Sequence, residues 1–257
     1  MTRTVSAGGA RSRCLALAAL LLACGQATAG SSSLDALLDQ LSGGFSVAVT
    51  GQSLSSKGKS TAFGPLDLAF RTGDGVQIEG PVRVSATVSP MVHAIVDPDQ
   101  LFLSTQPRLA AVWVDLTAPD VPADVKDAVR ILGMKKPASA AAARLRREAR
   151  VLESDRTLVF KGKRGDVWTL ELDHRKLPRT LVATMPSSDR VDLAFEDWRP
   201  GKPAGFTLPL QRAEYRPTTW QGLLRLPRDL KASVDQVKQS VNQLRDAVQE
   251  GLRSLFR

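Results

Sequence analysis

Apolar and polar residues alternate along most of this chain. Phe45, Val47 and Val49, for example, are separated by single residues. The same spacing recurs, between turn residues, in the segments 66–70, 76–88, 92–96, 101–103, 109–116, 158–160, 168–172, 181–183, 191–195 and 206–210. Because successive side chains of a β-strand point to opposite faces, this period of two predicts about eleven antiparallel strands.

Most of these segments have one strongly apolar face and one mixed face. A βαβ array would show continuously apolar strands instead, so the pattern argues against that class. Helical spacing is found at 34–41, at 119–134 and at 137–150, where an Ala/Arg-rich segment forms a helix or a linker. The chain is therefore predicted to be α+β, with a single curved antiparallel sheet covered by helices.

The C-terminal segment has a separate helical pattern. After Pro227, apolar residues step by four and three at Leu230, Val234, Val237, Val241, Leu244, Val248, Leu252 and Leu255. Charged residues lie between them, which predicts an amphipathic helix with a narrow, heptad-like stripe. This stripe has three alternative uses: packing on the sheet, self-association as a coiled coil, or lying on a membrane surface.

The first residues have the pattern of a secretory signal. Arg3, Arg11 and Arg13 precede an apolar run of about nine residues, and small residues follow it. A membrane-spanning helix would need roughly 20 apolar residues. We therefore expect a signal peptide at 1–29, a sheet domain at 30–226 and the amphipathic helix at 227–257.

Two cleavage patterns overlap in this signal. The Ala-Thr-Ala at 27–29 predicts a soluble chain that begins near Gly30, whereas the lipobox-like residues 21–25 predict a chain lipidated at Cys24. Since Cys14 is the other of the two cysteines, the mature chain has no disulfide in either case. We expect a periplasmic protein, either soluble or anchored to the outer membrane through Cys24.

The chain is also basic, with a formal net charge of +9, and loss of the three signal arginines leaves about +6. In an exported protein this charge favours anionic lipid head groups over nucleic acid as partners.

Motifs for catalysis and metal binding give little support to an enzyme. His93 lies in a predicted strand, His174 lies in a turn, and the domain at 30–226 has no cysteine, which argues against a zinc site. Residues 56–59 match S-x-x-K, but they lie in a loop and no K-T-G follows. We expect no catalytic residue, no metal and no cofactor.

A curved one-layer sheet leaves space on its concave apolar face that helices seldom fill completely. An acyl chain of about 14 CH₂ groups buried there contributes on the order of 10 kcal/mol. The candidate cavity residues are the large apolar side chains of the alternating faces: Phe70, Ile78, Val84, Phe102, Trp113, Trp168, Leu170, Phe195 and Phe206.

Two stretches have the form of known strand pairs. Residues 94–103 place Asp-Pro-Asp between two apolar runs, and residues 191–198 are followed by a late Leu-Pro-Leu strand at 208–210. Over roughly residues 34–217 the chain thus resembles the outer-membrane lipoprotein carriers, the LolA/LolB-like superfamily of periplasmic lipid-binding half-barrels. The resemblance implies an unclosed half-barrel of roughly eleven strands lidded by helices, and Pro98 departs from the family's turn glycine.

The leading hypothesis is an exported, non-enzymatic protein that binds lipid or the acyl chains of a lipoprotein, as a carrier or chaperone does. One alternative is an envelope scaffold or assembly module that acts through its C-terminal helix and binds a protein partner or a second copy. Another is an envelope hydrolase.

The two cleavage patterns make opposite predictions for the variant Cys24→Ser. If Cys24 is lipidated, the substitution converts a detergent-extracted protein into a soluble periplasmic one. If cleavage follows Ala29, fractionation stays unchanged and N-terminal sequencing finds Gly30 first.

Overall fold

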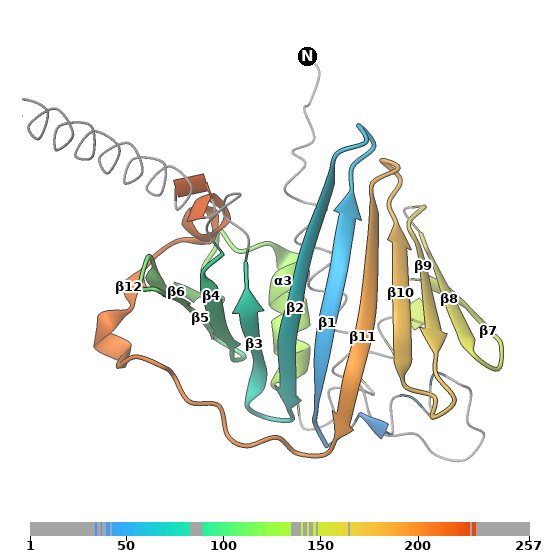
Figure 1. Cartoon of the computed structure of the whole chain (residues 1–257), viewed down its shortest axis with the longest axis horizontal. Helices are drawn as coiled ribbons and strands as arrows, with labels where there is room; N and C mark the ends of the chain where they lie inside the picture. The colour runs from blue at the N-terminus through green and yellow to red at the C-terminus, as the bar shows by residue number, and fades with distance from the viewer. Residues whose placement is uncertain are drawn as a thin grey trace, which may run out of the picture.

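The computed structural model contains one sheet of twelve strands, in the order β12-β6-β5-β4-β3-β2-β1-β11-β10-β9-β8-β7 (Figure 1). It describes residues 43–82, 89–134, 149–163, 165–226 and 228–229, together with 34, 37, 40, 41, 140, 143, 146 and 147. Neighbouring strands are antiparallel except for β12, which pairs with β6 in parallel. The prediction of a curved antiparallel sheet that does not close into a barrel is confirmed.

The strands in chain order are β1 (Phe45–Leu54), β2 (Ser60–Arg71), β3 (Gly75–Pro81), β4 (Met91–Val96), β5 (Gln100–Gln106), β6 (Ala111–Asp115), β7 (Ala149–Glu153), β8 (Thr157–Gly162), β9 (Val167–Leu172), β10 (Pro178–Thr184), β11 (Arg190–Pro200) and β12 (Arg216–Pro217). The helix α3 (Ala123–Leu132) follows β6, and the 3-10 helix η1 (Arg212–Glu214) precedes β12.

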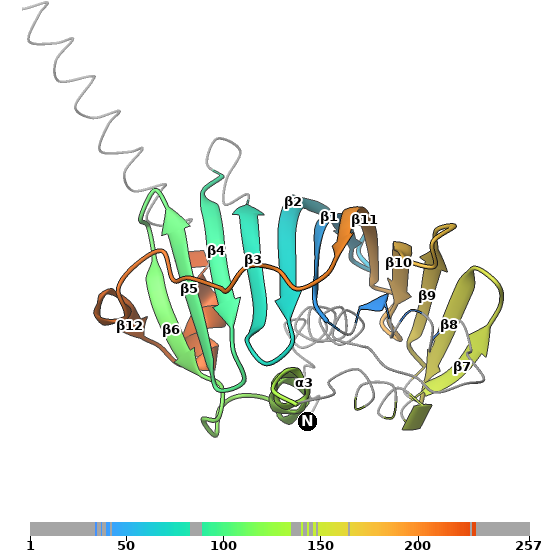
Figure 2. The same ribbon diagram turned by 90° about the horizontal axis from the view of Figure 1, so that it is seen from below.

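The register shows which side chains share a face of the sheet. One row of directly opposed residues crosses β1 to β6 at Phe45, Phe70, Val76, Val96, Leu101 and Val114. Figure 2 shows that the sheet curves around the side on which α3 lies. This row faces that side, because Val96 and Leu101 pack against the cluster that contains Val125 of α3.

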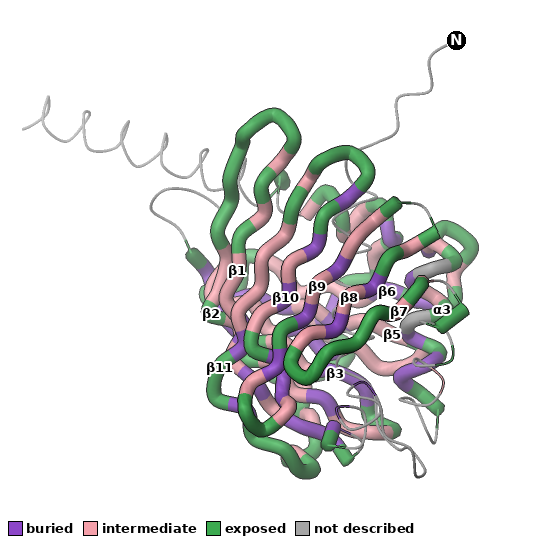
Figure 3. Tube along the Cα trace, turned by 90° about the vertical axis from the view of Figure 1, so that its right-hand side faces the viewer, coloured by how far each residue is buried: buried purple, intermediate pink, exposed green. Residues whose placement is uncertain are grey.

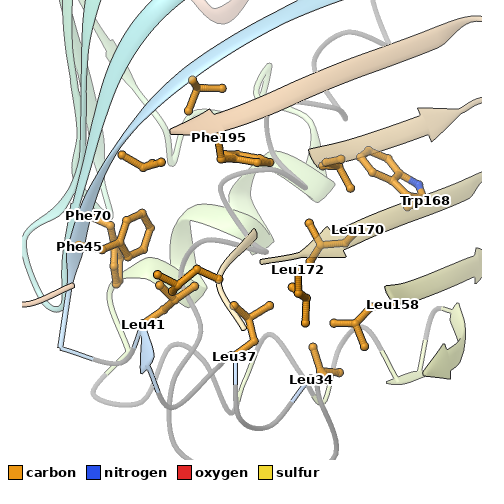
Figure 4. Packing of buried hydrophobic residues seen from close by; sticks show 14 of the residues in the cluster. Leu34, Leu37, Leu41, Phe45, Phe70, Leu158, Trp168, Leu170, Leu172 and Phe195 are labelled. Atoms are coloured by element: carbon orange, nitrogen blue, oxygen red, sulfur yellow. The ribbon is translucent and has the colours of Figure 1, made fainter. Parts of the chain in front are cut away.

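Helical residues cover part of the concave face. Leu34, Leu37 and Leu41 are fully buried in the main core with Phe45 and Phe70 (Figure 4). In α3, Ile131 and Leu132 belong to the same core, while Val125 and Val129 belong to a second cluster near β6. The sheet cannot bury its apolar face alone, and these residues supply cover for the part of the face that they contact.

The second cluster ties the far end of the described chain to β6. Trp220 is buried there with Val114 and Leu116, and its backbone N–H donates to the Asp120 carboxylate at 2.9 Å. Residues 220–226 are helical and lie directly before the expected boundary at residue 227.

Residues 201–211 and η1 cross the convex face between β11 and β12, and we call residues 201–215 the strap (Figure 2). The predicted strand at 206–210 is wrong, because the strap pairs with no strand there. Alternation of apolar residues is necessary for a half-buried strand, but pairing also needs a free sheet edge beside it. The strap crosses the face of the sheet instead.

The Ala/Arg-rich segment divides into two parts in the structure. Residues 140, 143, 146 and 147 are helical, whereas Ala149–Glu153 form the edge strand β7, which the sequence pattern does not predict. The turn at 97–99 is confirmed, since Asp97 Oδ1 accepts the backbone N–H groups of Asp99 at 2.9 Å and of Gln100 at 2.6 Å.

The loops at the two ends of the sheet differ in length and exposure. We call the end with the β1–β2, β5–β6, β8–β9 and β10–β11 loops the upper end, as drawn in Figure 1. The long β1–β2 and β10–β11 hairpins project from it with exposed tips (Figure 3). Leu34, Leu37 and Leu41 pack in the same core as Phe45, which lies at the lower end at the start of β1.

The expected signal peptide at 1–29 and the stripe of the expected helix from residue 230 onward lie outside the described residues. Within the part of the chain that the structure describes, no helix has the length and apolar character needed to span a membrane.

Phe70→Ala is expected to lower the free energy of unfolding by about 3–5 kcal/mol. The Phe70 side chain is fully buried in the main core, so its removal leaves a cavity there. Thr61→Ala in the exposed part of the same strand serves as the control and is expected to change little. Urea titration followed by tryptophan fluorescence measures both. Equal effects of the two substitutions would contradict the assignment of the concave core.

Candidate functional site

The concave face is covered unevenly from its lower to its upper end. In β1 the exposed fraction of the inward side chains rises from 0% at Phe45 to 3% at Val47 and 7% at Val49. In β2, Phe70 is fully buried while Leu66 is half-buried. The helical cover thus seals the lower half of these central strands and leaves their upper half partly open.

We call the half-buried apolar residues of the central and left-hand strands the upper strip. The register places each of them in phase with inward residues. Ile78, Leu103 and Val112 lie two residues from members of the row through Phe45, Leu66 lies opposite Val49, Phe63 and Leu193 lie opposite Gly51, and Val191 lies two residues before Leu193. The upper strip consists of Phe63, Leu66, Ile78, Leu103, Val112, Val191 and Leu193.

Gly51 shapes the middle of the upper strip. A Cβ at this position would lie 2.6 Å from Phe63 Cζ and 2.7 Å from Leu193 Cδ2. Both side chains therefore lie down against the backbone of β1, which no larger residue at position 51 would allow. The result is a low apolar floor between β2 and β11.

Five of the nine predicted cavity residues come together on the concave face. Phe70, Trp168, Leu170 and Phe195 belong to the main core, and Ile78 packs against it (Figure 4). Four of them are therefore structural core, and among the nine candidates Ile78 alone belongs to the upper strip.

Phe102 and Trp113 occupy the opposite face. They lie opposite each other in β5 and β6, one residue out of phase with Leu101 and Val114 of the concave row. Their expected place in the concave cavity is therefore corrected by the register. Phe102 is covered by the strap instead, with its ring 5.3 Å from that of Tyr215 and the Arg212 guanidinium 5.2 Å from its centroid.

Phe206 also lies on the convex side, where it lines a pocket of about 630 Å³ between the strap and β1–β3. The floor of this pocket is hollow because small residues, Ser46, Ala48 and Ala69, face the strap there. The remaining candidate, Val84, lies outside the described residues, as do Cys24 and the stripe at Leu230, Val234, Val237, Val241, Leu244, Val248 and Leu255.

An ion pair and a capping interaction hold the far end of the strap. Arg108 Nη1 is 2.8 Å from Glu214 Oε1, and Glu214 Oε2 accepts the backbone N–H of Gln211 at 2.9 Å. These two interactions hold the pKa of the Glu214 carboxyl below its usual value, with the Gln211 N–H as the larger cause. The strap is thus fixed over β5, where Tyr215 is buried.

The indole N–H groups of Trp168 and Trp198 in the core are satisfied. Trp168 Nε1 donates to Asp166 Oδ2 at 2.8 Å, and Trp198 Nε1 donates to the Pro178 carbonyl at 2.6 Å. The core beneath the upper strip is therefore paired, and the strip presents carbon atoms rather than polar groups.

His93 is half-buried on the convex face, with its Nε2 3.1 Å from Gln77 Nε2. Burial lowers the pKa of the imidazole, and the neighbouring Glu79 carboxylate opposes this effect. The Gln77 amide donates to the neutral ring, which makes His93 a hydrogen-bonded histidine of the sheet.

The sequence pattern does predict which face the residues of the upper strip occupy, but the choice of the largest side chains as candidates passes over them. Leu66 and Leu193 alternate in phase with Phe70 and Phe195, so the pattern places them on the correct faces. The candidate residues are chosen for large side chains, which are the ones that fill a core. Exposure depends on where the helices end, and strand periodicity contains no information about that.

No protein-family model and no curated protein matches the chain. The solved structures that match include an uncharacterized conserved protein from Thermus thermophilus, with 10% identity, 73% of this chain and 96% of that chain covered, and a TM-score of 0.41. A LolA superfamily protein from Nitrosomonas europaea has 8% identity, coverages of 70% and 96%, and a TM-score of 0.30.

A third match, from Vibrio parahaemolyticus, is described as an outer membrane lipoprotein-sorting protein domain. It has 10% identity, coverages of 71% and 92%, and a TM-score of 0.31. The superfamily that the sequence resembles is thus found again among the structural neighbours. These likenesses are too distant to support an argument about function, so the function is argued from the surfaces of this chain.

His93→Gln is expected to reduce the loss of stability in mild acid. A folded-state pKa below 6.5 means that the neutral ring contributes stability above the unfolded pKa, and that this contribution is lost as the pH falls below it. Between about pH 7 and pH 5 the parent protein should lose more unfolding free energy than the variant. If urea titration shows that both proteins lose equal unfolding free energy between about pH 7 and pH 5, the prediction is wrong. Losses of unfolding free energy that both proteins share below about pH 5 are assigned to carboxylates such as Glu214, whose pKa lies below its usual value.

Proposed function

We propose that this protein is a non-enzymatic carrier that binds a lipid, or the acyl chains of a lipoprotein, along the upper strip. The observation that carries the proposal is the graded cover of the concave face, sealed by helices below and partly open above. The resemblance of the sequence to the lipoprotein carriers points to the same class of cargo. The expected site of action is the periplasm, after removal of the signal.

The upper strip is chemically suited to an acyl chain. Phe63, Leu66 and Leu193 form an apolar floor above Gly51, and the indoles of the nearby core keep their own hydrogen-bond partners. Each CH₂ group that leaves water contributes about 0.8 kcal/mol, without requiring a polar group from the protein. Binding by apolar contact alone also makes the site tolerant of chain length.

Cargo on the upper strip would leave the folded core intact. The fully buried residues of the lower half, such as Phe45 and Leu37, contribute to stability whether or not cargo is bound. A bound chain then adds cover to residues that are already half-exposed. This favours reversible exchange, because release exposes the strip but does not unfold the sheet.

The test is the binding of a fatty acid that carries an environment-sensitive fluorophore. The parent protein is expected to raise its fluorescence, and the double variant Leu66→Gln/Leu193→Gln is expected to weaken binding at least about tenfold, since two of its apolar contacts become amides. Far-UV circular dichroism checks that the sheet is retained.

Val182→Gln is the matched control, because Val182 is half-buried in the neighbouring strand β10 but faces the convex side. It should bind the probe as the parent does. A folded parent protein that leaves the probe dark, or equal weakening by Val182→Gln and by the double variant, would overturn the proposal.

A further inference from the structure

Lysines gather at the upper end of the sheet. Lys57 and Lys59 lie in the tip of the β1–β2 hairpin, and Lys161 and Lys163 lie at the β8–β9 turn. All four are exposed, and the hairpin tip projects beyond the neighbouring strands (Figure 3).

The two acidic residues of these upper loops are used within the loops. Asp189 Oδ1 accepts the backbone N–H of Ser56 at 2.8 Å, which joins the β10–β11 loop to the β1–β2 hairpin. Asp166 accepts the indole N–H of Trp168. The Ser56–Asp189 hydrogen bond holds the β1–β2 and β10–β11 loops together, so Lys57 and Lys59 lie on a hairpin tip that is fixed to its neighbour.

Several basic residues are paired with acidic ones, at the upper end (Arg108 with Glu214 and Arg190 with Asp192) as well as at the lower end. At the lower end, Arg71 Nε lies 2.8 Å from Asp74 Oδ2, and Arg175 Nε lies 3.4 Å from Asp173 Oδ2. Lys176 Nζ contacts the Asp155 carboxylate there. Asp97 and Asp99 add negative charge to the β4–β5 turn. Acidic residues therefore offset much of the positive charge at the lower end.

Large exposed apolar side chains occur at the same end as the lysines. Leu54 ends β1, Met91 begins β4 and Leu109 lies in the β5–β6 loop, with exposed fractions of 41%, 41% and 40%. Isolated exposed apolar residues need no explanation, but three of them at the same end of the sheet as four exposed lysines form the combination that suits a membrane interface.

We propose that the upper end docks on the surface of a bilayer that contains anionic phospholipid. The lysines contact the head groups, and Leu54, Met91 and Leu109 enter the boundary between head groups and acyl chains. A backbone-tracking nucleic acid would use the lysines and would stack its bases on aromatic side chains, whereas the exposed apolar residues at this end are aliphatic, as suits insertion among acyl chains.

This inference rests on the proposed function in one respect. The upper strip opens toward the same end, with Leu66 and Leu193 nearer to it than Phe70 and Phe195 are. Docking in this orientation would bring the strip to the bilayer surface, where an acyl chain enters or leaves. The proposed function does not need such docking, so each can fail alone.

The experiment is co-sedimentation with phosphatidylglycerol/phosphatidylcholine vesicles and with pure phosphatidylcholine vesicles. The exported chain carries Cys24→Ser so that no lipid anchor contributes. We expect binding to the anionic vesicles, little binding to the neutral ones, and weakening as salt rises from about 0.05 M to about 0.5 M.

Two pairs of matched variants test whether binding depends on where a charge or an apolar side chain lies, and not only on its presence in the protein. Lys57→Gln/Lys59→Gln should weaken binding to anionic vesicles at least about tenfold, whereas Arg179→Gln/Lys202→Gln at the lower end should leave it unchanged. Leu54→Ser should weaken it several-fold, whereas Leu152→Ser in the edge strand β7 should not.

Failure of the parent to bind anionic vesicles, or equal effects of the upper and lower variants, overturns the docking surface. Equally tight binding of a single-stranded oligonucleotide that is lost in Lys57→Gln/Lys59→Gln would also overturn it in favour of a nucleic-acid surface. Binding of the fluorescent fatty acid in solution, without vesicles, tests the carrier function separately from the docking surface. Docking without probe binding contradicts the carrier function, and probe binding without docking contradicts the membrane surface.

Discussion

The structure depends on burying one apolar face of a sheet that does not close. A closed barrel covers its interior with its own strands, but this sheet ends at β12 on one side and at β7 on the other. The row from Phe45 to Val114 therefore needs side chains from outside the sheet. Leu34, Leu37 and Leu41, together with α3, supply them at one end of the concave face, and this position of the helices creates the upper strip.

The convex face is stabilised by a different device. The strap covers Phe102 in the left half of the sheet, where Tyr215 and Arg212 contact the Phe102 ring. Over β1–β3 the same strap passes above alanines and a serine, so a pocket is left beneath it. The strap therefore packs on the apolar ring of Phe102 over β5, and it passes above the small side chains of β1 and β2 without filling the space over them. At its centre β5 therefore carries apolar side chains on both faces, with Leu101 and Leu103 on the concave face and Phe102 on the convex one.

The two-sided burial of β5 explains which parts of this structure the sequence could predict. Period two assigns residues to the same face within one strand, as it does for Leu66, Leu68 and Phe70. It cannot choose between two apolar faces, so the pattern groups Phe102 with Phe70 although register places them on opposite sides. Residues 206–210 alternate as a strand does, and only the three-dimensional course of the chain shows that no edge is free for them.

The open geometry also sets how strongly the proposed acyl cargo could be held. Fourteen or so methylene groups contribute on the order of 10 kcal/mol when fully buried, and association itself costs an amount in the range of about 4–15 kcal/mol. A strip that covers only one side of an acyl chain gains only a fraction of this burial free energy. Binding would therefore be weak enough to reverse. A bilayer at the upper end would cover the other side during transfer. Partial cover of the strip therefore suits a carrier that must release its cargo, whereas a closed cavity would suit storage.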